Sequence, residues 1–130
     1  MNHPSAVKVV IVDDDPEMSF ILGQVLTAAG YEVTLLKDGE EALKYLEKAR
    51  PDVVITDVML PHIDGWTLCK KIKQMPHARN LPVVVLTAKD QETDQLMSYE
   101  SGADEHISKP FRNENLIEIV QQLTAGKTTP

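Results

Sequence analysis

The chain has 130 residues, and its 13 Lys and Arg residues against 20 Asp and Glu residues give a formal net charge of −7. This length is typical of one globular domain, and a charged fraction of 25% is ordinary for a folded protein rather than a disordered one. The acidic balance repels phosphate backbones, which argues against direct binding of nucleic acid.

Cysteine usage and hydropathy indicate a cytoplasmic protein. Cys69 is the single cysteine, so neither an intrachain disulfide nor a thiolate metal cluster can form. The longest apolar runs, such as residues 9–12, are far too short to cross a bilayer. Residues 1–6 lack the basic start and apolar stretch of a secretory signal. We therefore expect a cytoplasmic location and no membrane insertion.

Short apolar runs alternate with segments of helical length. The first run, residues 7–12, is followed by a helix that begins with Asp15 as N-cap and Pro16 and ends at Gly30. A second run precedes a helix that begins at a capping box of Asp38 and Glu41 and extends to about residue 49. The second strand is predicted at 31–36. Three further strands are predicted at 53–56, 83–86 and, more weakly, 105–107. The helices that follow these three strands are predicted at 65–75, 91–101 and 113–123, respectively.

This alternation indicates a doubly wound α/β fold, because parallel strands need crossover helices. The first, third and fourth strands are continuously apolar, as is typical of central strands, whereas the second and fifth are more polar and suit the edges. The pattern predicts a flavodoxin-like (βα)5 sandwich with a five-stranded parallel sheet of order 2-1-3-4-5. We expect one domain at residues 7–124, with flexible termini at 1–6 and 125–130.

Polar residues follow the predicted strands at the edge where such folds bind ligands. Asp13 and Asp14 follow the first strand, Asp57 the third and Thr87 the fourth, and Lys109 follows the fifth. Carboxylates brought together repel one another unless a cation lies among them. Mg²⁺ suits such oxygen ligands, and Mn²⁺ is also possible.

A carboxylate beside such a cation can attack phosphorus and form an aspartyl phosphate. Asp57 is the best candidate nucleophile because it extends from the middle strand, while Asp13 and Asp14 would hold the metal. Lys109 and the Thr87 hydroxyl could neutralise and align the phosphoryl oxygens. Asp15 is interpreted as a simple helix cap.

Four motifs in this order resemble the receiver domain of two-component response regulators. They are Val12-Asp13-Asp14, Asp57 within residues 56–65, Thr87-Ala88 and Lys109-Pro110-Phe111, and the resemblance covers residues 7 to about 124. It implies that Asp57 accepts a phosphoryl group from a phosphohistidine on a sensor histidine kinase or a histidine phosphotransfer protein. It also implies that Mg²⁺ is bound by Asp13, Asp14, Asp57 and the backbone carbonyl of Met59.

The resemblance assigns the conformational switch to Thr87 and to an aromatic position that His106 occupies here. Histidine departs from the usual Tyr or Phe, so His106 is open to two interpretations, a switch residue or an ordinary edge-strand residue. The Lys109–Pro110 peptide is usually cis in this family. Met59 and Lys89 would border the path of the hydrolytic water, and we expect the bulk of Met59 to slow hydrolysis.

Two other classes compete with this interpretation. A haloacid-dehalogenase-like phosphatase would use Asp13 of an Asp-x-Asp motif, but Glu17 and the missing late acidic pair disfavour it. A receiver-like adaptor would bind partners without phosphorylation. An FMN-binding flavodoxin is disfavoured because Asp13 to Asp15 would repel the phosphate. A receiver would lose stable phosphate capture on replacement of Asp57, the phosphatase would fail on replacement of Asp13, and the adaptor would tolerate both changes.

The spacing of Met18, Ile21, Val25 and Ala28 predicts the buried stripe of the first helix. Phe20 lies off that stripe, where exposure for contact with a kinase and partial burial are both open. Cys69 and Trp66 are expected to be packing residues.

The chain is either a stand-alone receiver that signals through its fourth helix, fifth strand and fifth helix, or part of a regulator with an effector domain. The fifth helix lacks basic residues, which disfavours the dimers of winged-helix regulators.

Overall fold

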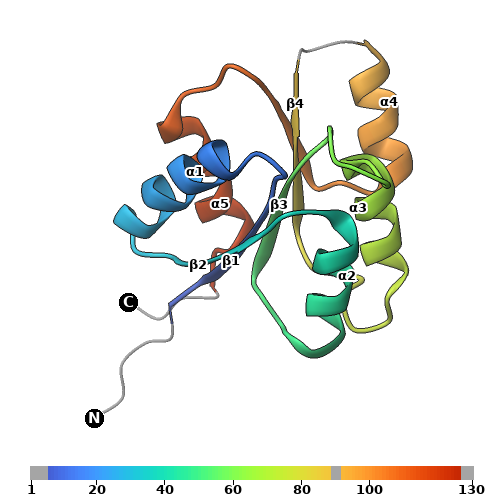
Figure 1. Cartoon of the computed structure of the whole chain (residues 1–130), viewed down its shortest axis with the longest axis horizontal. Helices are drawn as coiled ribbons and strands as arrows, with labels where there is room; N and C mark the ends of the chain where they lie inside the picture. Colours follow the sequence, from blue (N-terminus) through green and yellow to red (C-terminus); the bar gives the residue numbers. More distant parts are fainter. Residues whose placement is uncertain (1–5, 89–91, 127–130) are drawn as a thin grey trace.

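A computed structural model describes residues 6–88 and 92–126 of the chain, without the side chains of residues 92–94 (Figure 1). Strands and helices alternate throughout these ranges. The elements are β1 (Lys8–Val12), α1 (Pro16–Ala28), β2 (Glu32–Leu36), α2 (Gly39–Lys48), β3 (Val53–Asp57), α3 (Gly65–Gln74), β4 (Val83–Thr87), α4 (Glu92–Ser101), β5 (Glu105–Ser108) and α5 (Asn113–Leu123). Each predicted element is present, with ends displaced by one or two residues; Gln91, the predicted start of α4, lies outside the described residues.

The strands form one parallel sheet in the order β2-β1-β3-β4-β5, as the sequence predicts. The three central strands are apolar because both of their faces are covered, and every residue of β4 is buried. In contrast, β2 has only half-buried and exposed residues, and β5 begins with exposed Glu105. The polar runs therefore lie at the two edges.

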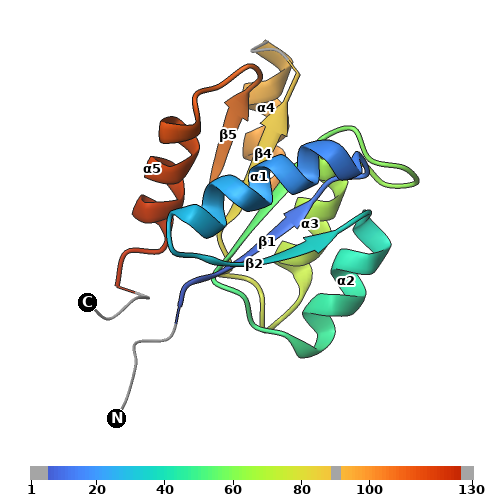
Figure 2. The same ribbon diagram turned by 60° about the vertical axis from the view of Figure 1, so that its left-hand side comes forward.

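Helices cover both faces of the sheet, with α1 and α5 on one side and α2, α3 and α4 on the other (Figures 1 and 2). Successive residues of β1 enter opposite cores: Val9 and Ile11 pack under α1 and α5, whereas Val10 and Val12 pack under α2 and α3. This period of two follows from the pleat of the strand. The sheet is thus fixed from both sides.

The predicted helix caps are present. Asp15 accepts hydrogen bonds from the backbone N–H groups of Glu17 and Met18 at the start of α1. Asp38 accepts one from Glu41 N at 2.8 Å, while the Glu41 carboxylate accepts one from Lys37 N at 2.9 Å. Gly30 follows α1 with φ +100°, the left-handed conformation that favours glycine.

The buried stripe predicted for α1 is wrong. The structure buries Ser19, Leu22, Gly23 and Leu26, whereas Ile21 and Ala28 are exposed and Met18 and Val25 are half-buried. Gly23 lies close to β2, because a Cβ at this position would be in van der Waals contact with Leu35, at 3.4 Å. The helix therefore faces the sheet with Leu22 and Leu26 together with the two small residues, while Ile21 and Ala28 lie outside this face.

Across the described ranges, each helix is too short or too polar to cross a membrane.

Candidate functional site

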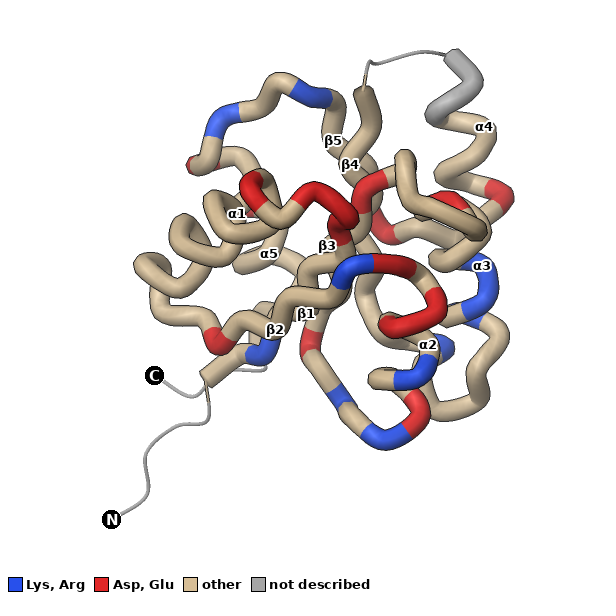
Figure 3. The backbone as a smooth tube through the Cα atoms, in the orientation of Figure 1, with Lys and Arg blue, Asp and Glu red and all other residues tan. Residues whose placement is uncertain are grey.

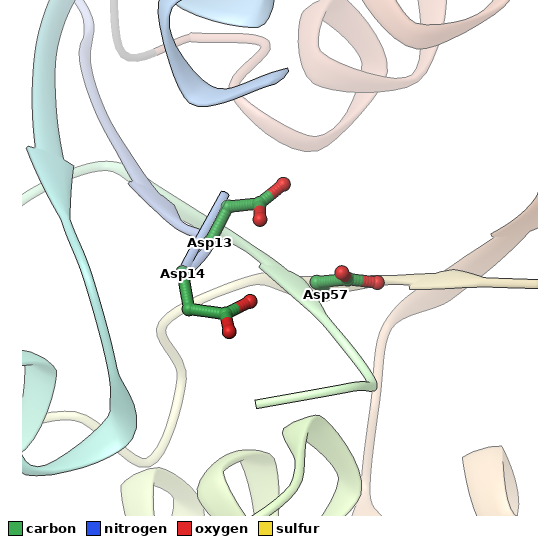
Figure 4. A group of neighbouring side chains, drawn as sticks. All are labelled: Asp13, Asp14 and Asp57. Atoms are coloured by element: carbon green, nitrogen blue, oxygen red, sulfur yellow. The ribbon is translucent and has the colours of Figure 1, made fainter. Parts of the chain in front are cut away.

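Three aspartates from two neighbouring strands meet at the carboxyl edge of the sheet, as predicted. Asp13 and Asp14 directly follow β1, and Asp57 is the last residue of β3. One carboxylate oxygen from each lies within 4.8 Å of the others. Figure 4 shows the three carboxyl groups around the ends of these strands, and Figure 3 shows the acidic β1–α1 loop, which carries two of them, in red. The arrangement concentrates negative charge at one point.

Asp13 is the most buried member of this group, with 4% of its surface exposed. Burial raises the pKa of its carboxyl above the ordinary value, and the nearby Asp57 carboxylate acts in the same direction. The backbone N–H of Asp15, which donates to Oδ1 at 2.9 Å, opposes this rise. Within the described part of the chain, Oδ2 of Asp13 is buried and accepts no hydrogen bond.

A divalent cation fits this group of oxygens. A buried carboxylate oxygen without a donor is costly unless something positive lies against it. The donors are all oxygens, which Mg²⁺ and Mn²⁺ favour, and Mg²⁺ is usually bound through one or two carboxylates together with retained waters. Met59 lies two residues after Asp57 with its side chain 72% exposed, so only its backbone carbonyl is a candidate ligand.

The Lys109 ammonium lies 3.2 Å from Oδ1 of Asp57. Lys109 directly follows β5, and its backbone N–H donates to the carbonyl of Thr87 at 2.7 Å, which ties the end of β5 to β4. The Lys109–Pro110 peptide is cis, as the family resemblance implies. The Asp57 carboxylate therefore lies between the carboxylates of Asp13 and Asp14 on one side and the Lys109 ammonium on the other.

Thr87 and His106 lie on the same face of the sheet. Thr87 is the buried last residue of β4, and its hydroxyl donates to the carbonyl of Ile107 at 3.4 Å. His106 pairs with Val85, one pleat before Thr87, and its half-buried ring makes an edge contact with Trp66 of α3 at 6.2 Å between centroids. The positions agree with either interpretation of His106, which stays a prediction.

Other singled-out residues are easily placed. Cys69 and Trp66 are buried packing residues, as expected; the Cys69 thiol donates to the carbonyl of Ser101, and burial raises its pKa. Phe20 is 60% exposed, which favours exposure over partial burial, and its contact with a kinase stays a prediction. Lys89 lies outside the described residues.

The close packing around the backbone carbonyl of Asp57 was not predicted from the sequence. A Cβ on Gly65 would collide with the Asp57 carbonyl oxygen, and the same oxygen accepts a hydrogen bond from the Thr56 hydroxyl at 3.0 Å. The first residue of α3 is thus in contact with the backbone of Asp57. A glycine directly after the N-cap Asp64 was the available signal, since glycine otherwise weakens a helix.

Comparison with known proteins assigns the family. The sequence model for the response regulator receiver domain matches residues 9–121. The chain belongs to this family. It is a receiver domain of two-component response regulators, and the phosphatase and flavodoxin alternatives are not favoured.

Curated relatives share this sequence over the receiver region. The chain is 42% identical to the alkaline phosphatase synthesis transcriptional regulatory protein PhoP of Bacillus subtilis, over 80% of this chain and 42% of that protein. It is 37% identical to the response regulator MprA of Mycolicibacterium vanbaalenii, over 95% of this chain and 52% of that protein. The chain thus spans about half of the length of these relatives.

Solved structures share the fold. The signal receiver domain of a histidine kinase from Syntrophus aciditrophicus has a TM-score of 0.87 at 36% identity, covering 93% of this chain and 92% of that chain. Chemotaxis response regulator CheY4 of Vibrio cholerae has a TM-score of 0.85 at 32% identity, covering 92% and 99%. The receiver domain of sensor histidine kinase PA1611 from Pseudomonas aeruginosa, which holds a magnesium ion in its active-site cleft, has a TM-score of 0.84 at 28% identity, covering 92% and 98%.

Proposed function

We propose that Asp57 accepts a phosphoryl group from a phosphohistidine of a sensor histidine kinase or a histidine phosphotransfer protein. A carboxylate oxygen of Asp57 forms the new bond to phosphorus while the donor's nitrogen–phosphorus bond breaks. The observation that carries this proposal is the place of Asp57, between two other carboxylates and the Lys109 ammonium at 3.2 Å. Asp15 has no part in it, because its side chain caps α1.

Asp13, Asp14, Asp57 and the carbonyl of Met59 would hold Mg²⁺, or Mn²⁺ in its place. The ion would neutralise charge on the phosphoryl oxygens, the main requirement of phosphoryl transfer besides alignment. Asp13 is suited to its role because its orientation is fixed: Oδ1 is held by Asp15 N, and the unpartnered Oδ2 remains available as a ligand.

Lys109 and Thr87 would recognise the phosphoryl group once it is on Asp57. The ammonium is already within reach of the acceptor carboxylate, so it can follow the negative charge onto the new phosphate oxygens. The Thr87 hydroxyl bonds to the Ile107 carbonyl at 3.4 Å, which is a long bond and therefore easily exchanged for a phosphate oxygen. His106, on the same face of the sheet, would adjust its place as Thr87 moves.

The output would be a population shift of the face formed by α4, β5 and α5. Contacts of the phosphate with Thr87 and Lys109 favour one of two arrangements of this face. The recipient is a downstream protein or an effector domain of a longer regulator. We place the receiver domain at residues 7–124, acting in the cytoplasm as a phosphoacceptor that promotes its own phosphorylation and its slow dephosphorylation.

The donor would dock beside the site on an apolar groove of about 440 Å³. The groove lies between α1 and the segment after β5, and Met18, Ile21, Pro110 and Phe111 are among its lining residues. Lys109 also lines it, which connects the groove to the acceptor site. The exposed residue Phe20 directly precedes the lining residue Ile21. An apolar helical surface carrying the phosphohistidine fits this groove.

Intact-protein mass after incubation with acetyl phosphate or phosphoramidate tests the proposal. We expect a gain of about 80 Da, one phosphoryl group, that requires Mg²⁺ and is lost in Asp57→Asn. Asp64→Asn is the matched control, because that exposed carboxylate caps α3 and should not affect labelling. An unlabelled wild-type protein, under conditions that label another receiver, would favour the adaptor that works without phosphorylation.

A further inference from the structure

A glycine outside the site packs against the loop that follows Asp57. Gly39 is the first residue of α2 and is buried. A Cβ at this position would lie 2.5 Å from both Cδ1 and Cγ1 of Ile63, closer than real Cβ atoms approach. Gly39 does not have a positive φ, so space rather than backbone conformation requires glycine here. The Ile63 side chain occupies the room that any other residue would need.

Ile63 belongs to the loop of residues 58–64, which carries the Met59 carbonyl. The loop is folded on itself by short-range bonds: the Val58 carbonyl accepts from Leu60 N and Gly65 N, and Ile63 N donates to the Pro61 carbonyl. Val58, Leu60 and Ile63 pack against the core under α2 and α3, while Met59 points outward. Ile63 is the member that reaches α2.

The start of α2 also borders the other acidic loop. Lys37 and Glu41 line one groove together with Asp13 and Asp14. The backbone N–H of Asp13 donates to the Leu36 carbonyl at the end of β2, directly before this segment. The segment from β2 into α2 is therefore in contact with both loops that supply the candidate cation ligands.

We infer that Gly39 and Ile63 are positioning residues of the cation site. Their close contact fixes the loop after Asp57 at a set distance from the Asp13 and Asp14 loop, and so orients the Met59 carbonyl toward the carboxylates. This inference rests on the proposed function, because it concerns the same cation. Neither side chain touches the cation itself.

The test measures binding of Mn²⁺ without any phosphodonor, by the electron paramagnetic resonance signal of free Mn²⁺. Gly39→Ala and Ile63→Ala should each weaken binding about tenfold, as is typical when a residue that orients ligands is changed. The double variant should bind no more weakly than Ile63→Ala alone, because removal of Cγ1 and Cδ1 makes room for the methyl group that Gly39→Ala introduces. Circular dichroism shows whether each variant is folded at the temperature used.

Two controls separate positioning from a general loss of stability. Gly23→Ala on α1 places a Cβ at an ordinary distance of 3.4 Å from Leu35 of β2. Ile72→Val removes one methylene from the core against which Ile63 packs. Both should bind Mn²⁺ like the wild type. Equal weakening in Ile72→Val and Ile63→Ala would overturn the inference, since any core defect would then suffice.

The remaining outcomes are also decisive. Wild-type binding with unchanged affinity in folded Gly39→Ala and Ile63→Ala overturns the inference and leaves the proposed function intact. Independent, multiplicative losses in the double variant overturn it as well, because the two residues would not act through one contact. If the wild type itself does not bind Mn²⁺, the cation step of the proposed function fails, and the inference fails with it. Should Gly39→Ala not fold, Ile63→Ala decides alone, since it introduces no collision.

Discussion

Three consecutive aspartates after β1 have three different environments. Asp13 is buried with one oxygen unpartnered, Asp14 is exposed but faces the same cluster, and Asp15 caps α1 through two backbone N–H groups. A charged side chain gains its role from what surrounds it, so the same residue type can serve as a ligand or as a cap. The sequence allowed this division to be predicted because the strand end and the helix start are both recognisable.

Lys109 offers the clearest test at this scale. Lys109→Met keeps much of the aliphatic stem but removes the ammonium that lies 3.2 Å from Asp57. We expect the rate of Asp57 labelling by phosphoramidate to fall about 100-fold, the usual loss when one charge-stabilising donor is removed from a reaction centre. Initial rates of mass gain measure it, with Lys109→Arg as the charge-retaining control. A rate equal to that of the wild type would remove Lys109 from the proposed chemistry.

Met59 is expected to control the lifetime of the phosphoryl group. Its side chain is 72% exposed beside the acceptor, where it can obstruct water without holding it. Met59→Asn should accelerate loss of the phosphoryl group about fivefold, or about 1 kcal/mol in the barrier, because an amide can hydrogen-bond the attacking water. The decay of the mass adduct measures this rate. Met59→Leu, of similar size, should decay like the wild type; equal decay of all three proteins would contradict the role assigned to bulk.

At the scale of elements, strand composition and cap residues were sufficient to predict the order of the sheet and the start of most helices. The orientation of α1 was not predictable in the same way. This helix carries Phe20, Ile21, Leu22, Val25 and Leu26 around most of its circumference, so apolar spacing does not select one face. The choice depends on packing against the sheet, where Leu22 and Leu26 enter the core and Gly23 lies close to Leu35 of β2. The Gly39–Ile63 contact was hidden for the same reason, because it depends on packing between the start of α2 and the loop after β3.

The α5 helix begins without a side-chain cap. Its N-cap residue is Arg112, whose side chain makes no capping hydrogen bond. Arg112 forms an ion pair with Glu114 at 3.8 Å, and both side chains are largely exposed. Arg112→Ser should raise the free energy of unfolding by about 0.5–1 kcal/mol, because serine can accept from the free N–H groups while the exposed ion pair contributes little. Urea denaturation measures the change.

A matched variant at α3 should change stability in the opposite direction. Asp64 accepts a hydrogen bond from Thr67 N at 2.8 Å, so Asp64→Ala should cost about 1 kcal/mol. If Arg112→Ser leaves the denaturation midpoint unchanged while Asp64→Ala lowers it, α5 gains nothing from a cap.

At the scale of the whole molecule, the acidic edge of the sheet couples cation binding to stability. Two strands that lie side by side in the centre of the fold end in carboxylates that repel one another, and burial adds to the cost at Asp13. A cation that binds only the folded chain stabilises it by mass action. The group of carboxylates that would permit phosphoryl transfer is therefore expected to lower the free energy of unfolding of the cation-free protein. The gain in stability on addition of a cation then measures cation binding at this site.

Asp13→Asn should reverse both effects. Without divalent cations, the amide removes a buried charge and its repulsion with Asp57, so the variant should be more stable than the wild type. With Mg²⁺ at about 100 times its dissociation constant, the wild type should gain about 2.7 kcal/mol and the variant almost nothing. Urea denaturation followed by Trp66 fluorescence, in EDTA and in Mg²⁺, measures both quantities. A Mg²⁺ response retained by Asp13→Asn would mean that this carboxylate does not bind the ion, and lower stability of the variant in EDTA would mean that its charge is balanced within the protein.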